Sequence, residues 1–332
     1  KEACRRINAP QLKPYQINAA KAYYKARGYK LKNTYGHRYT TALNGVFRED
    51  YVPKDIFNPF ISQRLNEQRQ WPALLDKNLT YNLFEEFEQP KRVVQNINGF
   101  YYINNKIVTE DIAVEACNVK NKSFVIKPSI ENGMGYMVEV FSVDDNISSL
   151  NGLTVLELFR LYKKDFIIQE KVEQNEFLKS LNPSSLNTLR IVSYLREDGV
   201  HLLSVALRIG MHGSKTDNFS DGGVFWGLDE LGIFRSKGYS KKAQFTEKSP
   251  SGVFVSGRKL PNYDAIVEMV KQMHVKIPYF KIVSWDIGIN DKDVPVFIEY
   301  NTYNQGVDIQ VANGPLFGKF ADEILALGLE AR

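Results

Sequence analysis

The stretch IVSWDIGINDKDVPVFIEYN, residues 282–301, determines how the rest of the chain is interpreted. Two apolar runs flank the polar residues 290–293, which predicts two antiparallel strands joined by a turn. Side chains alternate along a strand, so Glu299 and Asn301 face the same way. A turn at this place puts Asp286 on that face as well. Three oxygen-bearing side chains are therefore predicted to meet on one patch of a sheet.

Two carboxylates on an apolar sheet are costly to bury unless a cation lies between them. Carboxylate and amide oxygens suit Mg²⁺, which binds to a few carboxylates together with nucleotide phosphates and water. The alternative is that these acids cap strand ends and are solvated. A pairing shifted by one residue would also turn Asp286 to the other face. We favour Asp286, Glu299 and Asn301 as a magnesium site.

A second segment, SFVIKPSIENGMGYMVEV at residues 123–140, places a lysine at the end of an apolar strand. Lys127 is a compact cation suited to phosphate. Gly133 and Gly135 in the following turn would let backbone amides approach phosphate oxygens. An exposed edge lysine beside an ordinary hairpin would give the same pattern. This segment alone leaves both interpretations open.

Two arginines lie within otherwise apolar predicted strands: Arg190 in TLRIVSY and Arg208 in VALRIG. A buried arginine needs an anionic partner. Either each pairs with a carboxylate such as Asp286 or Glu299, or each faces a phosphate or a substrate carboxylate. We favour the second alternative for at least one of them.

The composition is that of a soluble globular protein, with 332 residues of which 43% are hydrophobic and 24% charged. The net charge of +5 suits small anionic ligands and falls short of a nucleic-acid-binding protein. Cys4 and Cys117 are predicted to be reduced thiols in the cytoplasm. No apolar run approaches the roughly 20 residues that span a bilayer. Four histidines without metal-ligand spacing are interpreted as structural or exposed: His37, His201, His212 and His274.

The spacing of apolar residues divides the chain into three predicted parts. Residues 1–92 are mostly helical by apolar spacing, and residues 93–172 form a compact unit of strands and helices. In residues 173–332 strands dominate. The predicted fold class is α+β.

The pattern WDI…VFIEYN resembles the magnesium signature of the ATP-grasp superfamily, in which an Asp on one strand and Glu-x-Asn on the next hold the metal ions that bind ATP. FVIKPS…NGMGY is similar to its strand lysine and glycine flap, and FIIQEKV to its adenine-binding hinge strand. The similarity spans about residues 76–315. NPSSLNTLRIVSY, ALRIGMHGSKTDNFSDGGVFWGLDELG and WDIGIND resemble a narrower group, the sugar-transfer-associated ATP-grasp proteins of bacterial surface polysaccharide biosynthesis.

The resemblance implies an ATP-grasp fold with a helical N-terminal region, a small α+β lid and a larger C-terminal sheet lobe. It implies ATP and Mg²⁺ as cofactors. The implied ATP contacts are Lys77, which follows the predicted helix N-cap Asp76, with Lys127, Gly133, Gly135, Gln169, Glu170, Lys171, Val172 and Glu176. The implied metal ligands are Asp286, Glu299 and Asn301. The implied catalytic residues are Arg190, Arg208 and Lys127, and the implied acceptor residues are Asn187, Arg208, Asp217 and Asn218.

The reaction that the resemblance implies is an ADP-forming ligation of a carboxylate and an amine through an acylphosphate. The expected acceptor is a uronic acid or another sugar carboxylate, joined to an amino acid or amine in capsule or surface polysaccharide biosynthesis. Polysaccharide-biosynthesis proteins are possible partners, and nucleic acid is not an expected one. The alternatives are an ATP-grasp phosphotransferase and a non-catalytic nucleotide-binding partner of a glycosyltransferase.

Overall fold

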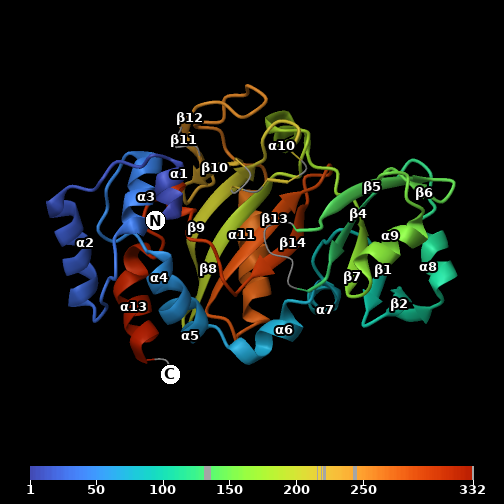
Figure 1. The fold of residues 1–332 in the computed structure, drawn as a ribbon, viewed down its shortest axis with the longest axis horizontal. Coiled ribbons are helices and arrows are strands. Elements are labelled where there is room, and N and C mark those ends of the chain that lie inside the picture. The colour runs from blue at the N-terminus through green and yellow to red at the C-terminus, as the bar shows by residue number, and fades with distance from the viewer. Residues whose placement is uncertain (131–135, 215, 218, 220–221, 242–244, 331–332) are drawn as a thin grey trace. The chain divides into compact units, whose positions relative to one another are not determined.

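The computed structural model describes residues 1–130, 136–214, 216–217, 219, 222–241 and 245–330. They group into two compact units, each built of helices and an antiparallel sheet, which confirms the predicted α+β class (Figure 1). The large unit comprises Lys1–Trp71, Asn175–Pro295 and Glu299–Arg332. The small unit comprises Pro72–Gln174 and Val296–Ile298. The division into residues 1–92, 93–172 and 173–332 stays a prediction.

The sheet of the large unit has the strand order β12-β11-β10-β9-β8-β13-β14 in the described residues. Its strands are β8 (Thr188–Arg196), β9 (Gly199–Ile209), β10 (Val224–Leu228), β11 (Phe234–Ser240), β12 (Phe245–Thr246), β13 (Ile282–Ile289) and β14 (Pro295–Asn301). The predicted hairpin is confirmed as β13 and β14. Its turn is closed by two backbone hydrogen bonds, from Asn290 N–H to Val294 O at 3.0 Å and from Asp293 N–H to Asn290 O at 2.9 Å.

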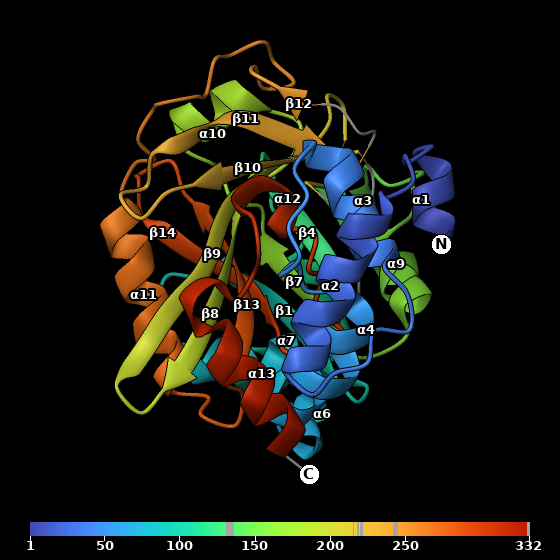
Figure 2. The same cartoon turned by 90° about the vertical axis from the view of Figure 1, so that its left-hand side faces the viewer.

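Helices cover both faces of this sheet. Val192 and Ser193 are neighbours on β8 and therefore point to opposite faces. Val192 belongs to a core formed with the N-terminal helices and α13, whereas Ser193 hydrogen-bonds to His274 of α11 at 2.8 Å. Figure 2 shows α11 on one side of the strands and α2 and α3 on the other. The described helices of this unit are α1 (Glu2–Arg6), α2 (Pro14–Ala26), α3 (Tyr35–Asn44), α4 (Lys54–Ile56), the π-helix Phe57–Ser62, α5 (Gln63–Leu65), the 3₁₀ helix Gln68–Gln70, α10 (Glu176–Leu181), α11 (Tyr263–Val275), α12 (Gln310–Asn313), the 3₁₀ helix Gly318–Phe320 and α13 (Ala321–Glu330). The short helix α6 (Trp71–Leu74) begins at the last residue of Lys1–Trp71 and continues into the small unit.

Two of the four histidines and both cysteines are buried. His37 and His274 are fully buried, and burial lowers the pKa of each to about 4, so both rings are neutral at pH 7. His201 is half-buried beside Asp198, and His212 is exposed. The two thiols, Cys4 and Cys117, are free and buried. Across the described residues, no helix has the length and apolarity needed to cross a bilayer.

The sheet of the small unit has the strand order β3-β2-β1-β7-β4-β5-β6 in the described residues. Its strands are β1 (Arg92–Ile97), β2 (Phe100–Ile103), β3 (Lys106–Val108), β4 (Ser123–Pro128), β5 (Glu139–Asp144), β6 (Ile147–Ser148) and β7 (Phe166–Glu170), and its helices are α7 (Lys77–Leu83), α8 (Glu110–Ala116) and α9 (Val155–Tyr162). Phe124 and Ile126 of β4 belong to its hydrophobic core. Because side chains alternate, Lys127 points to the face opposite Ile126.

Candidate functional site

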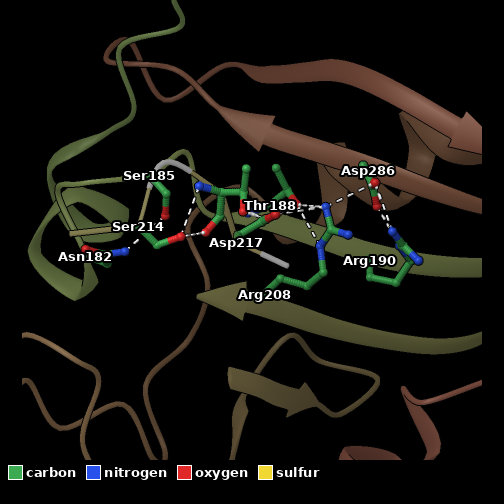
Figure 3. Close-up of polar contacts among 9 residues, drawn as sticks. Asn182, Ser185, Thr188, Arg190, Arg208, Ser214, Asp217 and Asp286 are labelled. Atoms are coloured by element: carbon green, nitrogen blue, oxygen red, sulfur yellow. Dashed lines mark hydrogen bonds and ion pairs between the residues drawn. The ribbon is translucent and has the colours of Figure 1, made fainter. Parts of the chain in front are cut away.

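Three adjacent strands of the large unit bring charged side chains together on one face. In the pairing of β8 with β13, Arg190 lies opposite Asp286. In the pairing of β8 with β9, Thr188 lies opposite Arg208. Directly opposed residues of antiparallel strands point to the same side. Residues 188 and 190 alternate onto that same side, so all four side chains form one cluster (Figure 3).

Asp286 is the acceptor for both arginines. Its Oδ1 lies 2.5 Å from Arg190 Nε and its Oδ2 lies 3.0 Å from Arg190 Nη2, which is a bidentate pair. Arg208 Nη2 lies 3.1 Å from the same Oδ2. Burial raises the pKa of Asp286, but the charges of Arg190 and Arg208 outweigh this and lower it below its ordinary value. Asp286 is therefore ionised at neutral pH although its side chain is only 1% exposed.

Glu299 of β14 joins this cluster. Its carboxyl group lies near Asp286, and its charge acts on Arg208. Tyr300, the next residue, packs on Trp285 with ring centroids 5.3 Å apart and so lies on the other face. Alternation then puts Asn301 on the face of Glu299. The tertiary structure thus brings Asp286 and Glu299 together, and the strand geometry places Asn301 beside them.

The donor set on this face consists of two carboxylates and one amide. No group of three His, Cys, Asp or Glu side chains within the described part of the chain could hold a metal ion by itself. Two carboxylates and an amide fit Mg²⁺, because this ion takes most of its ligands from substrate phosphates and water. The assignment of Asp286, Glu299 and Asn301 as its ligands stays a prediction.

Arg208 has a second acidic partner in Asp217, whose Oδ1 lies 3.1 Å from Arg208 Nη2. Burial lowers the pKa of Arg208, but the charges of Asp217, Asp286 and Glu299 raise it above its ordinary value. The sequence left each arginine either a carboxylate partner or a phosphate or substrate partner. The structure shows both Arg190 and Arg208 paired with a carboxylate. Contact of Arg190 or Arg208 with a phosphate or substrate stays a prediction.

The predicted acceptor residues are placed as follows. Asn187 is fully buried, and its amide donates to Leu178 O and Asn182 O, both at 2.9 Å. These bonds tie the end of α10 to the start of β8. Asp217 is buried in the ion pair described above, and Asn218 lies outside the described residues. Their contact with an acceptor stays a prediction.

The segment that carries Asp217 packs on the chain before β8 without spare room. Asn182 Nδ2 donates to Gly210 O at 2.9 Å and to Ser185 Oγ at 3.0 Å. A Cβ atom on Gly210 would lie 2.4 Å from Ser185 Oγ and 2.5 Å from Thr216 O. Only a glycine at this position lets the two segments approach so closely.

We expect Gly210→Ala to lower the free energy of unfolding by about 1–3 kcal/mol, because the backbone atom at Thr216 must shift to relieve the overlap. Urea unfolding followed by circular dichroism measures the change. The matched control is Gly306→Ala, where nothing lies within 4 Å of the added Cβ. Equal stability of the two variants would contradict the expectation.

In the small unit, two of the predicted phosphate residues are described. Lys127 is 7% exposed and lies opposite Ile167 of β7. Lys77 begins α7, where Asp76 is the N-cap as predicted, since its side chain accepts from Asn78 N–H at 2.9 Å. Gly133 and Gly135 lie outside the described residues.

The predicted hinge residues Gln169 and Glu170 end β7. Gln169 Nε2 donates to Pro90 O at 3.3 Å. Glu170 pairs with Lys122 at 2.7 Å and with Lys91 at 3.0 Å. Burial raises the pKa of Glu170, but these two lysines lower it overall. Both side chains are thus used within the small unit.

The remaining predicted nucleotide contacts follow β7. The Lys171 N–H donates to Ser123 O at 2.8 Å, so this amide is used within the sheet. The predicted adenine contact therefore rests on the carbonyl of Lys171 and on Val172. Glu176 begins α10 with a side chain that is 92% exposed and lies 3.6 Å from Lys179. Its predicted ribose contact stays a prediction.

Sequence reasoning missed Thr188, which touches both Arg208 and Asp217. A signal for it exists in TLRIVSY, because a threonine two residues before Arg190 on a strand shares its face.

The model of the sugar-transfer associated ATP-grasp family matches residues 57–324. A search of curated proteins gives no match.

Among solved structures, the L-amino acid ligase from Bacillus licheniformis is similar with 15% identity and a TM-score of 0.44, over 78% of this chain and 48% of that one. The ATP-grasp ligase PsnB, complexed with a phosphomimetic variant of its minimal precursor, Mg and ADP, is similar with 11% identity and a TM-score of 0.46, over 79% and 62%. The N5-carboxyaminoimidazole ribonucleotide synthetase from Thermotoga maritima is similar with 9% identity and a TM-score of 0.38, over 73% and 50%.

The match thus spans less than two thirds of each of these solved proteins. The family model, in contrast, spans most of the present chain. The protein belongs to the sugar-transfer associated ATP-grasp family.

Proposed function

We propose that the protein is an ATP- and Mg²⁺-dependent ligase that joins a carboxylate to an amine and releases ADP and phosphate. The observation that carries this proposal is the meeting of Asp286 and Glu299 on adjacent strands, with Asp286 held ionised by two arginines. In a member of an ATP-grasp family, such a pair is suited to a metal ion that binds nucleotide phosphates.

The proposed reaction has two steps. A carboxylate oxygen of the acceptor attacks the γ-phosphorus of ATP, the bond to the bridging oxygen of ADP breaks, and an acylphosphate forms. The amine nitrogen then attacks the acyl carbon, phosphate leaves with the C–O bonding pair, and the amine loses a proton. When bound, Mg²⁺ neutralises charge on the phosphates during the first step.

The chain's own residues would position the reactants and neutralise charge. Lys77 and Lys127 would contact phosphates, for which a lysine ammonium is suited. Arg190 and Arg208 would offset the charge of the transferring group near Asp286. None of these residues would form a covalent bond to the substrate. The protein would therefore contribute orientation of the reactants and electrostatic stabilisation.

We propose a uronic acid or a similar sugar carboxylate as the acceptor, in the synthesis of a bacterial surface polysaccharide. The support for this finer assignment is the family description, which associates these proteins with sugar transfer. The amine would come from an amino acid or a small amine.

The test is Mg²⁺-dependent ADP release, screened over uronic acids combined with amino acids and amines, with mass spectrometry of the products. We expect release that needs the carboxylate, and an amide product that needs both substrates. Hydroxylamine should trap the acylphosphate as a hydroxamate, whereas a phosphate ester does not react in this way.

The outcomes separate the alternatives. A stable phosphorylated sugar formed without amine, and no hydroxamate, would replace the ligase by a phosphotransferase. Mg²⁺-dependent ATP binding without turnover on any pair would favour a nucleotide-binding partner of another enzyme. Absence of ATP binding would overturn the proposal.

A further inference from the structure

Thr188 occupies a junction between two charged groups of the cluster. Its Oγ1 donates to Asp217 Oδ2, and its backbone N–H donates to the same oxygen at 3.0 Å. Its Oγ1 also accepts from Arg208 Nε at 3.1 Å and from Nη2 at 2.8 Å. One hydroxyl thus joins an acid and a guanidinium that lie on different segments of the chain (Figure 3).

Asp217 reaches this position from outside the sheet. It follows β9 by several residues, and the chain folds back so that its carboxylate meets the first residue of β8, 29 positions earlier. Thr188 is 4% exposed and Asp217 is 7% exposed, so water competes little with these bonds. Asp217, Thr188 and Arg208 therefore form one buried hydrogen-bonded unit.

The two arginines differ in how they are held. Arg208 Nη2 is shared among Thr188 Oγ1, Asp217 Oδ1 and Asp286 Oδ2, at 2.8, 3.1 and 3.1 Å. Arg190 pairs with Asp286, and within the described residues it has no second ion pair. Arg208 thus has Thr188 and Asp217 as further partners besides Asp286, whereas the described residues give Arg190 an ion pair with Asp286 alone.

We propose that Thr188 and Asp217 are positioning residues for Asp286: they fix the Arg208 guanidinium, and Arg208 in turn fixes the Asp286 carboxylate in the orientation that a metal ion needs. This inference rests on the proposed function of Asp286 as a magnesium ligand. Groups that hydrogen-bond to metal ligands commonly set the orientation of those ligands, and their loss weakens metal binding. Thr188 and Asp217 act one step further out, through Arg208.

The experiment measures ATP binding by calorimetry over a series of free Mg²⁺ concentrations, for the full chain and its variants. Thr188→Val removes the hydroxyl and keeps the shape of the side chain. Mg²⁺ is expected to increase the ATP affinity, and the midpoint of this increase defines the Mg²⁺ requirement. We expect Thr188→Val to raise the free Mg²⁺ concentration at that midpoint by about 10- to 100-fold. Thr188→Ser restores the hydroxyl and should stay within about threefold of wild type. ATP affinity in EDTA should not change.

A purely structural role would lower stability without moving the Mg²⁺ requirement. Thr40→Val is the matched control, because Thr40 is a buried threonine in α3 of the same unit. It should leave the Mg²⁺ requirement unchanged at a similar loss of thermal stability. Asp217→Asn removes the negative charge that pairs with Arg208 and should move the Mg²⁺ requirement in the same direction as Thr188→Val. It serves in place of Thr188→Val if that variant does not fold.

An unchanged Mg²⁺ requirement in folded Thr188→Val or Asp217→Asn would overturn this inference and leave the proposed function standing. Wild-type protein whose ATP binding does not depend on Mg²⁺ would overturn both together.

Discussion

Replacing Asp286 by Asn should lower the free energy of unfolding by about 3–5 kcal/mol. Both Asp286 oxygens accept from arginines, and the amide of Asn cannot neutralise a guanidinium. Arg208 retains Asp217, but the described residues give Arg190 no other ion pair. A buried cation without its counter-charge is strongly destabilising. Urea unfolding at pH 7 measures the loss.

The pH dependence of this loss follows from the ionisation of Asp286. Burial raises its pKa, and the two arginines lower it below the ordinary 3.8. A carboxyl with a lowered folded-state pKa contributes stability above its unfolded-state pKa and loses it as the pH falls through the folded-state value. We therefore expect the same difference between wild type and Asp286→Asn at pH 7 and at pH 5.

Two further variants test the cause. Arg190→Met in the Asp286→Asn background should recover part of the lost stability. The double variant no longer contains the buried Arg190 guanidinium that Asp286→Asn leaves without its counter-charge. Asp322→Asn is the matched surface control. Its side chain is 81% exposed beside Arg27, and its loss should stay below about 1 kcal/mol. A cost for Asp286→Asn as small as that of Asp322→Asn would contradict the buried ion-pair network.

Glu299→Gln should reduce Mg²⁺-dependent ADP release by about 100-fold or more, which corresponds to about 3 kcal/mol of transition-state stabilisation. The substitution keeps the shape of the side chain and removes one negative charge next to Asp286. A site that binds a divalent cation needs that charge, so the Mg²⁺ requirement for ATP binding should rise together with the loss of turnover. Steady-state kinetics with the best substrate pair, with a magnesium titration, measures both.

The matched control for Glu299→Gln is Glu268→Gln on the exposed surface of α11, where Glu268 accepts a hydrogen bond from Gln272 at 2.8 Å. It makes the same chemical change away from the cluster and should leave turnover unchanged. Wild-type turnover in Glu299→Gln would remove this residue from the metal site. It would also leave the proposed function without the observation that carries it.

The prediction of the small unit shows the limit of local patterns. The spacing of Leu79, Leu83 and Phe87 predicts one helix with an apolar face through Phe87, but α7 ends at Leu83. Asn78 is buried in it, whereas Leu79 is 46% exposed. The Asn78 amide donates to Asn96 O of β1 at 3.1 Å. The face that a short helix buries was therefore decided by a backbone acceptor on another element.

The sequence by itself determined the hairpin of β13 and β14 and the α+β class, and the family resemblance added the N-cap at Asp76. These features depend on alternation, turn residues and capping within a few positions of the chain, which are local effects. The shared face of Asp286 and Glu299 needed the register of the two strands as well, because a pairing shifted by one residue would have turned Asp286 to the other face.

Only the tertiary structure decided which partners the buried charges take. Arg190 and Asp286 are 96 positions apart, and Thr188 and Asp217 are 29 apart. The sequence left two alternatives for each arginine, because a buried guanidinium accepts any anion that the fold brings near. Strand pairing places Asp286 beside Arg190, and the fold-back of the chain after β9 places Asp217 beside Arg208. Pairings between residues so far apart in the sequence depend on packing across the whole sheet. A local sequence pattern therefore does not predict them.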